Sequence, residues 1–137
     1  MTIFPYKLML TLLCVTFLVE AQETSIITIN HSNYNRMINL AKKPTIVDVY
    51  APWCSPCKKM MPIFEQVALE LGDSYNFAKL NIAESGSMIK QFNVSSVPTL
   101  LFFDNGYFLD KVSGFKTAQE IKILIYSYYG KPVTVLP

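Results

Sequence analysis

The chain has 137 residues, a length that suits a single domain. Its hydrophobic content of 51% and charged content of 16% exclude an intrinsically disordered chain. The 12 basic and 10 acidic residues leave a formal net charge of +2, and no basic stripe runs among the aromatic residues, so we expect no binding to nucleic acid.

An uncharged apolar segment opens the chain. Lys7 precedes the apolar run at residues 8–19, and a V-x-A pattern ending at Ala21 suits cleavage by a signal peptidase. These features predict a cleaved signal peptide over residues 1–21 and a single domain with a short carboxyl-terminal tail over residues 22–137. The alternative is an uncleaved membrane anchor, but the apolar run is shorter than the ~20 residues that span a bilayer. We therefore expect an extracytoplasmic protein.

The three cysteines fall into two groups. Cys14 lies inside the apolar run and would leave with the signal peptide. Cys54 and Cys57 then remain as the only cysteines, so they can pair only with each other or with a partner molecule. No framework of structural disulfides is possible, and we infer that this pair serves chemistry outside the cytoplasm.

The elements of the first half alternate between strands and helices. β-Branched residues predict a short strand at residues 25–29, and apolar spacing predicts a helix at residues 33–42 that Pro44 ends. The apolar run at residues 45–50 is typical of a buried parallel strand. Beyond the cysteines, residues 58–71 carry apolar side chains at helical spacing, which predicts a longer helix.

The second half is richer in strands. Its pattern predicts three strands and a short helix, at residues 76–82 (strand), 87–92 (helix), 99–104 (strand) and 107–113 (strand). Asn105-Gly106 separates the last two strands and suits a tight hairpin turn.

A last helix ends the domain. Thr117 is its expected amino-terminal cap, and apolar spacing continues to about Tyr129. The resulting order βαβαβαββα predicts an α/β fold with a central mixed β-sheet flanked by helices on both faces.

Cys54 and Cys57 lie at the turn between the buried strand and the longer helix. The start of a helix offers unsatisfied N–H groups and the positive end of a dipole, which favour a thiolate over a thiol. A dithiol in this position is suited to exchanging disulfides with other molecules. The competing interpretation is a non-catalytic binding module that holds a metal. A structural zinc site needs four ligands, however, and His31 is the only histidine that could join the two cysteines, so we expect no metal.

Four sequence motifs resemble those of the thioredoxin family. They are residues 47–58, which include Trp53-Cys54-Ser55-Pro56-Cys57, then residues 77–82, residues 96–103 and the Asn105-Gly106 turn. The resemblance runs from about Ile26 to Tyr129. It implies a thioredoxin fold and a thiol–disulfide oxidoreductase that needs no cofactor beyond a redox-active Cys54–Cys57 disulfide.

The resemblance also implies roles for the catalytic residues. Cys54, at the surface, would attack a substrate disulfide to form a mixed disulfide, and the more buried Cys57 would resolve it. Asp48 would be the buried carboxylate that takes a proton from Cys57, with Lys79 as its partner. Burial should raise the pKa of Asp48 toward neutrality. A purely structural ion pair between Asp48 and Lys79 remains the alternative.

Further residues match the family's substrate-binding surface. Pro98 resembles the family's cis-proline, and the backbone of Val97 would pair with an extended substrate peptide beside the dithiol. Trp53, Pro56 and Gly114 would complete an apolar surface for the partner.

Two positions depart from the common pattern of the family. Ser55 replaces the usual glycine between the cysteines, and Phe115 replaces a smaller residue after Gly114. No histidine lies between the cysteines to stabilise the reduced thiolate, which favours a potential nearer the ~−270 mV of thioredoxin than the ~−120 mV of the periplasmic oxidant. We therefore expect a reductase of protein disulfides. An extracytoplasmic dithiol oxidase or disulfide isomerase is the alternative.

The expected partners follow from this chemistry. They are disulfide-containing protein substrates and an upstream thiol reductant, either a reductase or a membrane electron-transfer protein. We expect the protein to act as a monomer, in the bacterial periplasm or as a secreted protein. The final residues Val135-Leu136-Pro137 are not an ER-retention signal, which favours the periplasm over a eukaryotic secretory route.

Overall fold

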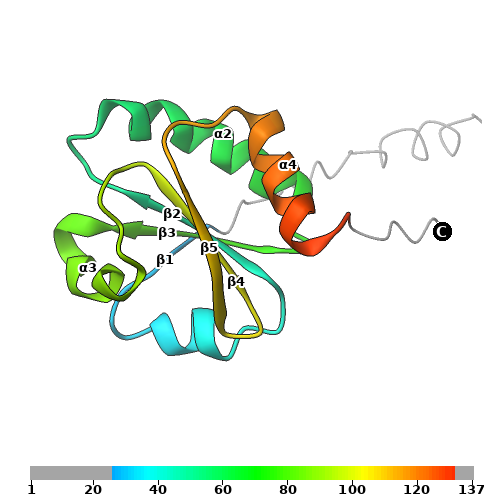
Figure 1. The fold of residues 1–137 in the computed structure, drawn as a ribbon, viewed down its shortest axis with the longest axis horizontal. Coiled ribbons are helices and arrows are strands. Elements are labelled where there is room, and N and C mark those ends of the chain that lie inside the picture. The colour runs from blue at the N-terminus through cyan, green and yellow to red at the C-terminus, as the bar shows by residue number, and fades with distance from the viewer. Residues whose placement is uncertain (1–25, 132–137) are drawn as a thin grey trace, which may run out of the picture.

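The computed structural model describes residues 26–131 (Figure 1). The predicted signal peptide at residues 1–21 and the tail beyond residue 131 lie outside the described residues, so those interpretations stay predictions. No helix between residues 26 and 131 is long and apolar enough to cross a membrane.

Five strands form one mixed sheet in the order β1-β3-β2-β4-β5. Their bounds are β1 (Ile27–Thr28), β2 (Thr45–Tyr50), β3 (Asn76–Asn81), β4 (Thr99–Asp104) and β5 (Tyr107–Ser113). The central strand β2 pairs parallel with β3 and antiparallel with β4. The continuous apolar runs of β2 and β4 suit strands that are buried on both faces. The predicted mixed sheet is confirmed.

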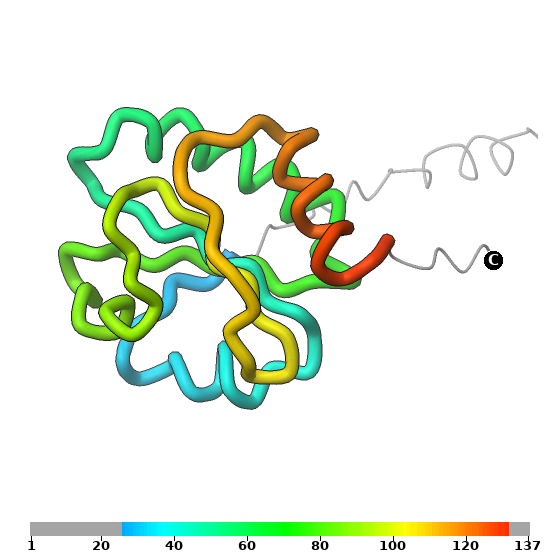
Figure 2. Tube along the Cα trace, viewed as in Figure 1, coloured from blue at the N-terminus to red at the C-terminus, as the bar shows by residue number. Residues whose placement is uncertain are grey.

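The hairpin between β4 and β5 turns at Asn105 and Gly106, as predicted (yellow in Figure 2). Both residues have positive φ angles, 49° and 83°, which asparagine and glycine adopt at low cost. A Cβ atom at Gly106 would also lie 2.8 Å from the carbonyl oxygen of Asn39, so close packing requires glycine there as well. Beyond the turn, the register of the two strands shifts between Phe102 and Phe103.

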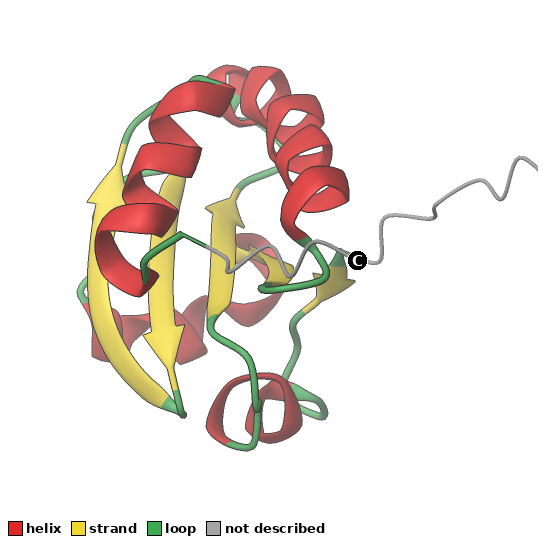
Figure 3. Ribbon diagram, turned by 90° about the vertical axis from the view of Figure 1, so that its right-hand side faces the viewer, coloured by secondary structure: helices red, strands yellow, loops and turns green. Residues whose placement is uncertain are grey.

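Helices cover both faces of the sheet (Figure 3). Their bounds are η1 (Asn35–Asn39), α2 (Ser55–Leu71), α3 (Ile82–Ile89), η2 (Lys90–Phe92) and α4 (Ala118–Tyr129). Helices α2 and α4 pack with Ile46 of β2 on one face, whereas η1, α3 and η2 pack with Val47 and Val49 on the other. Successive residues of β2 thus enter opposite cores, since side chains alternate along a strand. This arrangement confirms the predicted fold class.

Two predicted helices differ from the observed ones. The helix expected at residues 33–42 is a single short π-helical segment, η1. The helix expected at residues 87–92 begins earlier, at Ile82, as α3. Its start is fixed by the Asn81 side chain, which accepts a hydrogen bond of 3.0 Å from the amide of Ala83.

Helix α4 begins with a capping box, in which Thr117 and Glu120 each accept a hydrogen bond from the other's backbone amide. The Thr117 hydroxyl accepts a hydrogen bond from the Glu120 amide (3.3 Å), and the Glu120 carboxylate accepts one from the Thr117 amide (2.7 Å). We expect Thr117→Ala to lower the free energy of unfolding by about 1 kcal/mol, because the Glu120 amide loses its hydrogen-bond acceptor. Urea unfolding measures this change. Glu120→Gln is the matched control, since glutamine can still accept from the Thr117 amide, and an unchanged midpoint for Thr117→Ala would refute the role of the cap.

Candidate active site

Cys54 and Cys57 are joined as a disulfide at the amino-terminal end of α2. Their Cα atoms lie 5.3 Å apart, and Cys54 occupies the capping position of the helix. Pro56 lies in the first turn of α2, where its missing N–H would have had no helical partner. The strand-to-helix turn therefore places both sulfurs at the positive end of the helix dipole, as the sequence predicts.

The backbone of α2 favours negative charge on the first sulfur. The amide of Cys57 donates a hydrogen bond of 3.2 Å to the Sγ atom of Cys54. In the reduced protein such a donor stabilises a thiolate on Cys54, which is the nucleophilic form of a cysteine.

Cys54 is less accessible than the resemblance implies. Its exposed fraction is 8%, because Val97 and Ile82 pack against the cluster that holds the two cysteines. Cys57 is more deeply buried, with an exposed fraction of 1%. Cys54 is therefore the more accessible of the two residues, which is the order that the resemblance implies.

Asp48 lies on the face of β2 that α2 covers. It shares this face with Ile46, two residues earlier, and its exposed fraction is 0%. Neither carboxylate oxygen has a hydrogen-bond partner among the described residues. Burial raises the pKa of Asp48 to about 7, and the charge of Lys79 opposes that rise. The carboxylate can therefore gain or lose a proton near neutral pH.

Lys79 lies directly opposite Asp48 in the pairing of β2 with β3. The two side chains make no ion pair within 4.0 Å, and whether Lys79 serves Asp48 chemically or only structurally stays a prediction. Lys79 is half-buried and acts on Asp48 through its charge alone. A buried carboxylate without a direct partner is costly to keep, which points to a chemical use.

The loop before β4 reaches the dithiol from the other side. The Val97–Pro98 bond is cis, Pro98 is buried, and Val97 packs against the cluster formed by Ala51 and the two cysteines. Among the described residues, neither the amide nor the carbonyl of Val97 has a hydrogen-bond partner. These two groups are free to pair with an extended peptide.

Exposed apolar groups flank the same region. The amide of Gly114 donates a hydrogen bond of 2.8 Å to the carbonyl of Pro98, which joins the loop after β5 to the loop before β4. Trp53 is 69% exposed and precedes Cys54 directly, Pro56 is exposed, and Phe115 is 42% exposed. The predicted partner-surface residues are thus at or near the dithiol, and their role in substrate binding stays a prediction.

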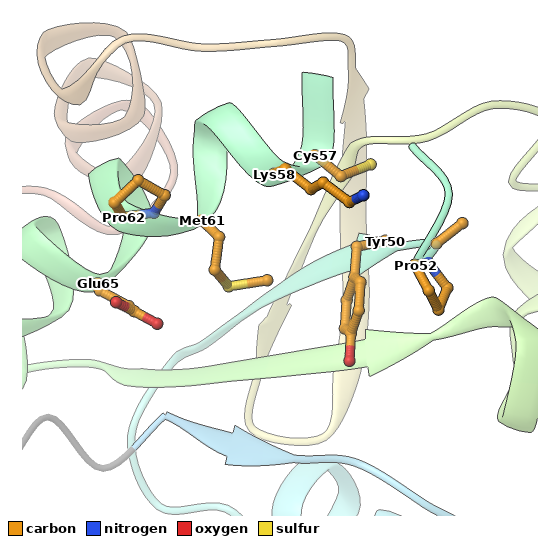
Figure 4. A pocket seen from close by; sticks show the side chains of 8 residues that line it. Tyr50, Pro52, Cys57, Lys58, Met61, Pro62 and Glu65 are labelled. Carbon is orange, nitrogen blue, oxygen red and sulfur yellow. The ribbon is translucent and has the colours of Figure 1, made fainter. Parts of the chain in front are cut away.

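Sequence reasoning missed a pocket behind the second cysteine (Figure 4). It has a volume of about 370 Å³, and its lining includes Tyr50, Pro52, Cys57, Lys58, Met61 and Glu65. Burial raises the pKa of Tyr50, and the charges of Glu84 and Asp48 raise it further. Tyr50 lies two residues after Asp48 on β2, so the alternation of the strand could have placed its ring beneath α2.

Metal ligands do not gather around the dithiol. Within residues 26–131, no three His, Cys, Asp or Glu side chains come together as a potential metal site. The ring of His31 contacts the hydroxyl of Ser87 at 3.3 Å instead.

Comparisons with known proteins agree with this geometry. A protein-family model described as Thioredoxin matches residues 25–127. The chain is 35% identical to a thioredoxin from Mycoplasmoides gallisepticum over 96 residues, which are 70% of this chain and 94% of that protein. It is 34% identical to a thioredoxin from Staphylococcus saprophyticus over 101 residues, 74% of this chain and 95% of that protein. Among solved structures, a thioredoxin from Malassezia sympodialis superimposes with a TM-score of 0.70 at 26% identity, covering 77% of this chain and 92% of that chain.

Proposed function

Because this chain belongs to the thioredoxin family, we propose that it is an exported member that acts as a reductant of protein disulfides. It is a thiol–disulfide oxidoreductase, and its redox-active group is the Cys54–Cys57 disulfide. The observation that carries this function is the position of that disulfide, at the amino-terminal end of α2 and on the same side of the sheet as the buried Asp48.

The reaction uses two successive thiol–disulfide exchanges. The Cys54 thiolate attacks a substrate disulfide, so a Cys54–substrate bond forms and the first substrate sulfur leaves as a thiolate. Cys57 then loses its proton, for which Asp48 is the proposed acceptor, and attacks Cys54 Sγ. The second substrate thiolate leaves and the Cys54–Cys57 disulfide forms. The substrate gains two electrons that the dithiol loses, and an upstream thiol reductant must restore the dithiol.

The direction of this exchange rests on the residues between the cysteines. Ser55 and Pro56 carry no positive group that would stabilise the reduced thiolate. A less stabilised dithiol gives up its electrons more readily, which supports a reductant over an oxidant. A dithiol oxidase or an isomerase on the same scaffold remains the second candidate.

A catalytic assay distinguishes these candidates. We expect the protein to accelerate the reduction of insulin, a protein with accessible disulfides, by dithiothreitol. It should not accelerate disulfide formation in a reduced, unfolded protein supplied with a mild oxidant. The reverse pair of results would assign the protein as an oxidase.

Export depends on the amino-terminal residues. When the full chain is expressed in a bacterium with a periplasm, we expect the recovered protein to begin at Gln22, because Ala21 would stand just before the cleaved bond. Intact mass spectrometry of the periplasmic fraction measures this. Ala21→Leu should block cleavage and leave the longer form. Recovery of the full chain from the cytoplasm in both cases would refute export.

A further inference from the structure

We propose that the hydroxyl groups of Thr99 and Ser113 position the peptide-pairing loop for protein substrates. The inference rests on the proposed function and adds two residues to it. Neither hydroxyl reacts, so both are positioning groups that act through the backbone of Val97.

The two hydroxyls form a directed chain of hydrogen bonds. Thr99 Oγ1 donates to the carbonyl of Ser96 at 2.7 Å and lies 2.9 Å from Ser113 Oγ. Because Thr99 uses its only proton on Ser96, Ser113 must be the donor in the second bond. Thr99 is fully buried, whereas Ser113 is exposed at the end of β5. The chain therefore runs from the surface into the loop that carries Val97.

Other contacts join the same two loops. Gly114 donates its amide to the carbonyl of Pro98 at 2.8 Å. Lys116 Nζ donates to the carbonyls of Ser113 (2.9 Å), Gly114 (3.3 Å) and Phe115 (3.3 Å), which holds the second loop in one conformation. The loop at residues 94–98 and the loop at residues 113–115 therefore behave as one unit.

The far end of the first loop is held as well. Lys111 Nζ donates to the carbonyl of Phe92 at 2.9 Å and to that of Asn93. The stretch between Asn93 and Thr99 is thus fixed at both ends, while the amide and carbonyl of Val97 keep no partner among the described residues. The amide and carbonyl of Val97 are therefore already positioned to pair with an extended substrate peptide. This preorganisation lowers the entropy cost of binding.

A small disulfide and a protein disulfide make different demands on the site, so comparing them as substrates separates the roles of Cys54 and Val97. A small aromatic disulfide needs only access to Cys54, whereas a protein disulfide also pairs with Val97. Loss of the hydroxyl chain should therefore raise KM for a protein substrate and leave both the rate with a small disulfide and the reduction potential unchanged. A residue that merely supported the fold would not separate these readouts.

The experiment compares Ser113→Ala and Thr99→Val with wild type, using insulin and 5,5′-dithiobis(2-nitrobenzoate) as substrates. We expect KM for insulin to rise about threefold to tenfold in Ser113→Ala, the range for loss of one neutral hydrogen bond, with kcat unchanged. Thr99→Val loses two hydrogen bonds, so KM should rise at least as much in that variant. Thr99→Ser keeps the hydroxyl and should restore KM to within about twofold of wild type. Ser127→Ala removes an exposed hydroxyl that bonds only to Leu124 in α4, and it should change nothing.

Other results would overturn the proposal. An unchanged KM for insulin in Ser113→Ala would do so, and this variant is informative even if Thr99→Val fails to fold, because Ser113 is exposed. An equal loss with insulin and with the small disulfide would show that the hydroxyls support the dithiol instead. If wild type reduces the small disulfide but not insulin, the proposed function fails first and the inference with it.

Discussion

Cys54→Ser is expected to reduce the catalysed reduction of insulin by roughly a thousandfold or more, because the variant lacks the nucleophile for the first exchange. Cys54 is the more exposed residue of the dithiol, and its Sγ atom accepts the amide hydrogen bond from Cys57. Serine at this position cannot form the mixed disulfide at neutral pH. Initial rates with dithiothreitol as the electron source measure the loss.

Cys57→Ser is the matched control, and it should fail at a different step. This variant keeps the Cys54 nucleophile but lacks the resolving thiol, so it should accumulate a stable mixed disulfide with its substrate. Non-reducing gels and intact mass spectrometry detect that adduct. If Cys54→Ser forms the adduct and Cys57→Ser does not, the assigned roles are reversed.

The second large effect is expected from Asp48→Asn, which should stabilise the oxidised protein at pH 8 by up to about 4 kcal/mol. The folded-state pKa of Asp48 is raised from 3.8 to about 7 by burial, so the folded protein binds a proton more tightly than the unfolded chain. The free energy of unfolding therefore falls as pH rises from about 4 to about 7, and above pH 7 the whole loss of stability is present. At 1.36 kcal/mol per pKa unit, a rise of about three units corresponds to the value given.

Chemical unfolding at several pH values measures this effect. The oxidised form is the right state, because disulfide-bonded cysteines do not titrate and add no pH dependence of their own. At pH 3 or below, wild type and Asp48→Asn should differ little, since the Asp48 side chain is then mostly neutral in both the folded and the unfolded chain. Asp73→Asn, at an exposed aspartate, is the control and should show no such pH-dependent gain. Equal stability of wild type and Asp48→Asn at pH 8 would contradict a buried, unpartnered carboxylate.

The same substitution should also slow the release of substrate. In the proposed mechanism Asp48 accepts the proton of Cys57, so without this carboxylate the mixed disulfide on Cys54 should persist longer near neutral pH. In the proposed mechanism, Asp48 lowers the stability of the fold and accelerates the second step. Asp48→Asn should gain stability and lose resolving rate together.

Much of the fold follows from local patterns in the sequence. The apolar runs of β2 and β4 and the Asn105-Gly106 turn predict those strands and their hairpin closely, because each signal lies within a few residues. The burial of Asp48 is also predictable, since a single carboxylate interrupts a run of buried strand residues.

The positioning contacts could not be predicted in this way, because they depend on register across the sheet. A simple two-residue hairpin at Asn105-Gly106 would place Thr99 opposite Val112. The register shift between Phe102 and Phe103 moves Ser113 into that place instead. The hydrogen bond between Thr99 and Ser113 thus depends on an irregularity that the turn sequence does not reveal.

The bounds of α3 and η1 differ from the predicted ones because they are set by a capping side chain and by packing against the sheet. Helix α3 begins after Asn81 because the side chain of Asn81 accepts a hydrogen bond from the amide of Ala83. The spacing of apolar residues in this segment does not indicate where the helix begins. Helix η1 is short although the apolar residues of its sequence suit a longer helix. Met37 and Ile38 are its buried residues, so the contact of η1 with the sheet is limited to one short face.

The reduction potential of the Cys54–Cys57 pair decides whether this protein reduces or oxidises protein disulfides. Equilibration of the protein with glutathione buffers of known ratio, read by mass after trapping free thiols, gives this potential, and Cys54→Ser provides the baseline. A value near the ~−270 mV of thioredoxin is the predicted result and would support a reductant that needs an upstream electron donor. A value near the ~−120 mV of the periplasmic oxidant would contradict it, because electrons would then flow from substrate thiols to the protein.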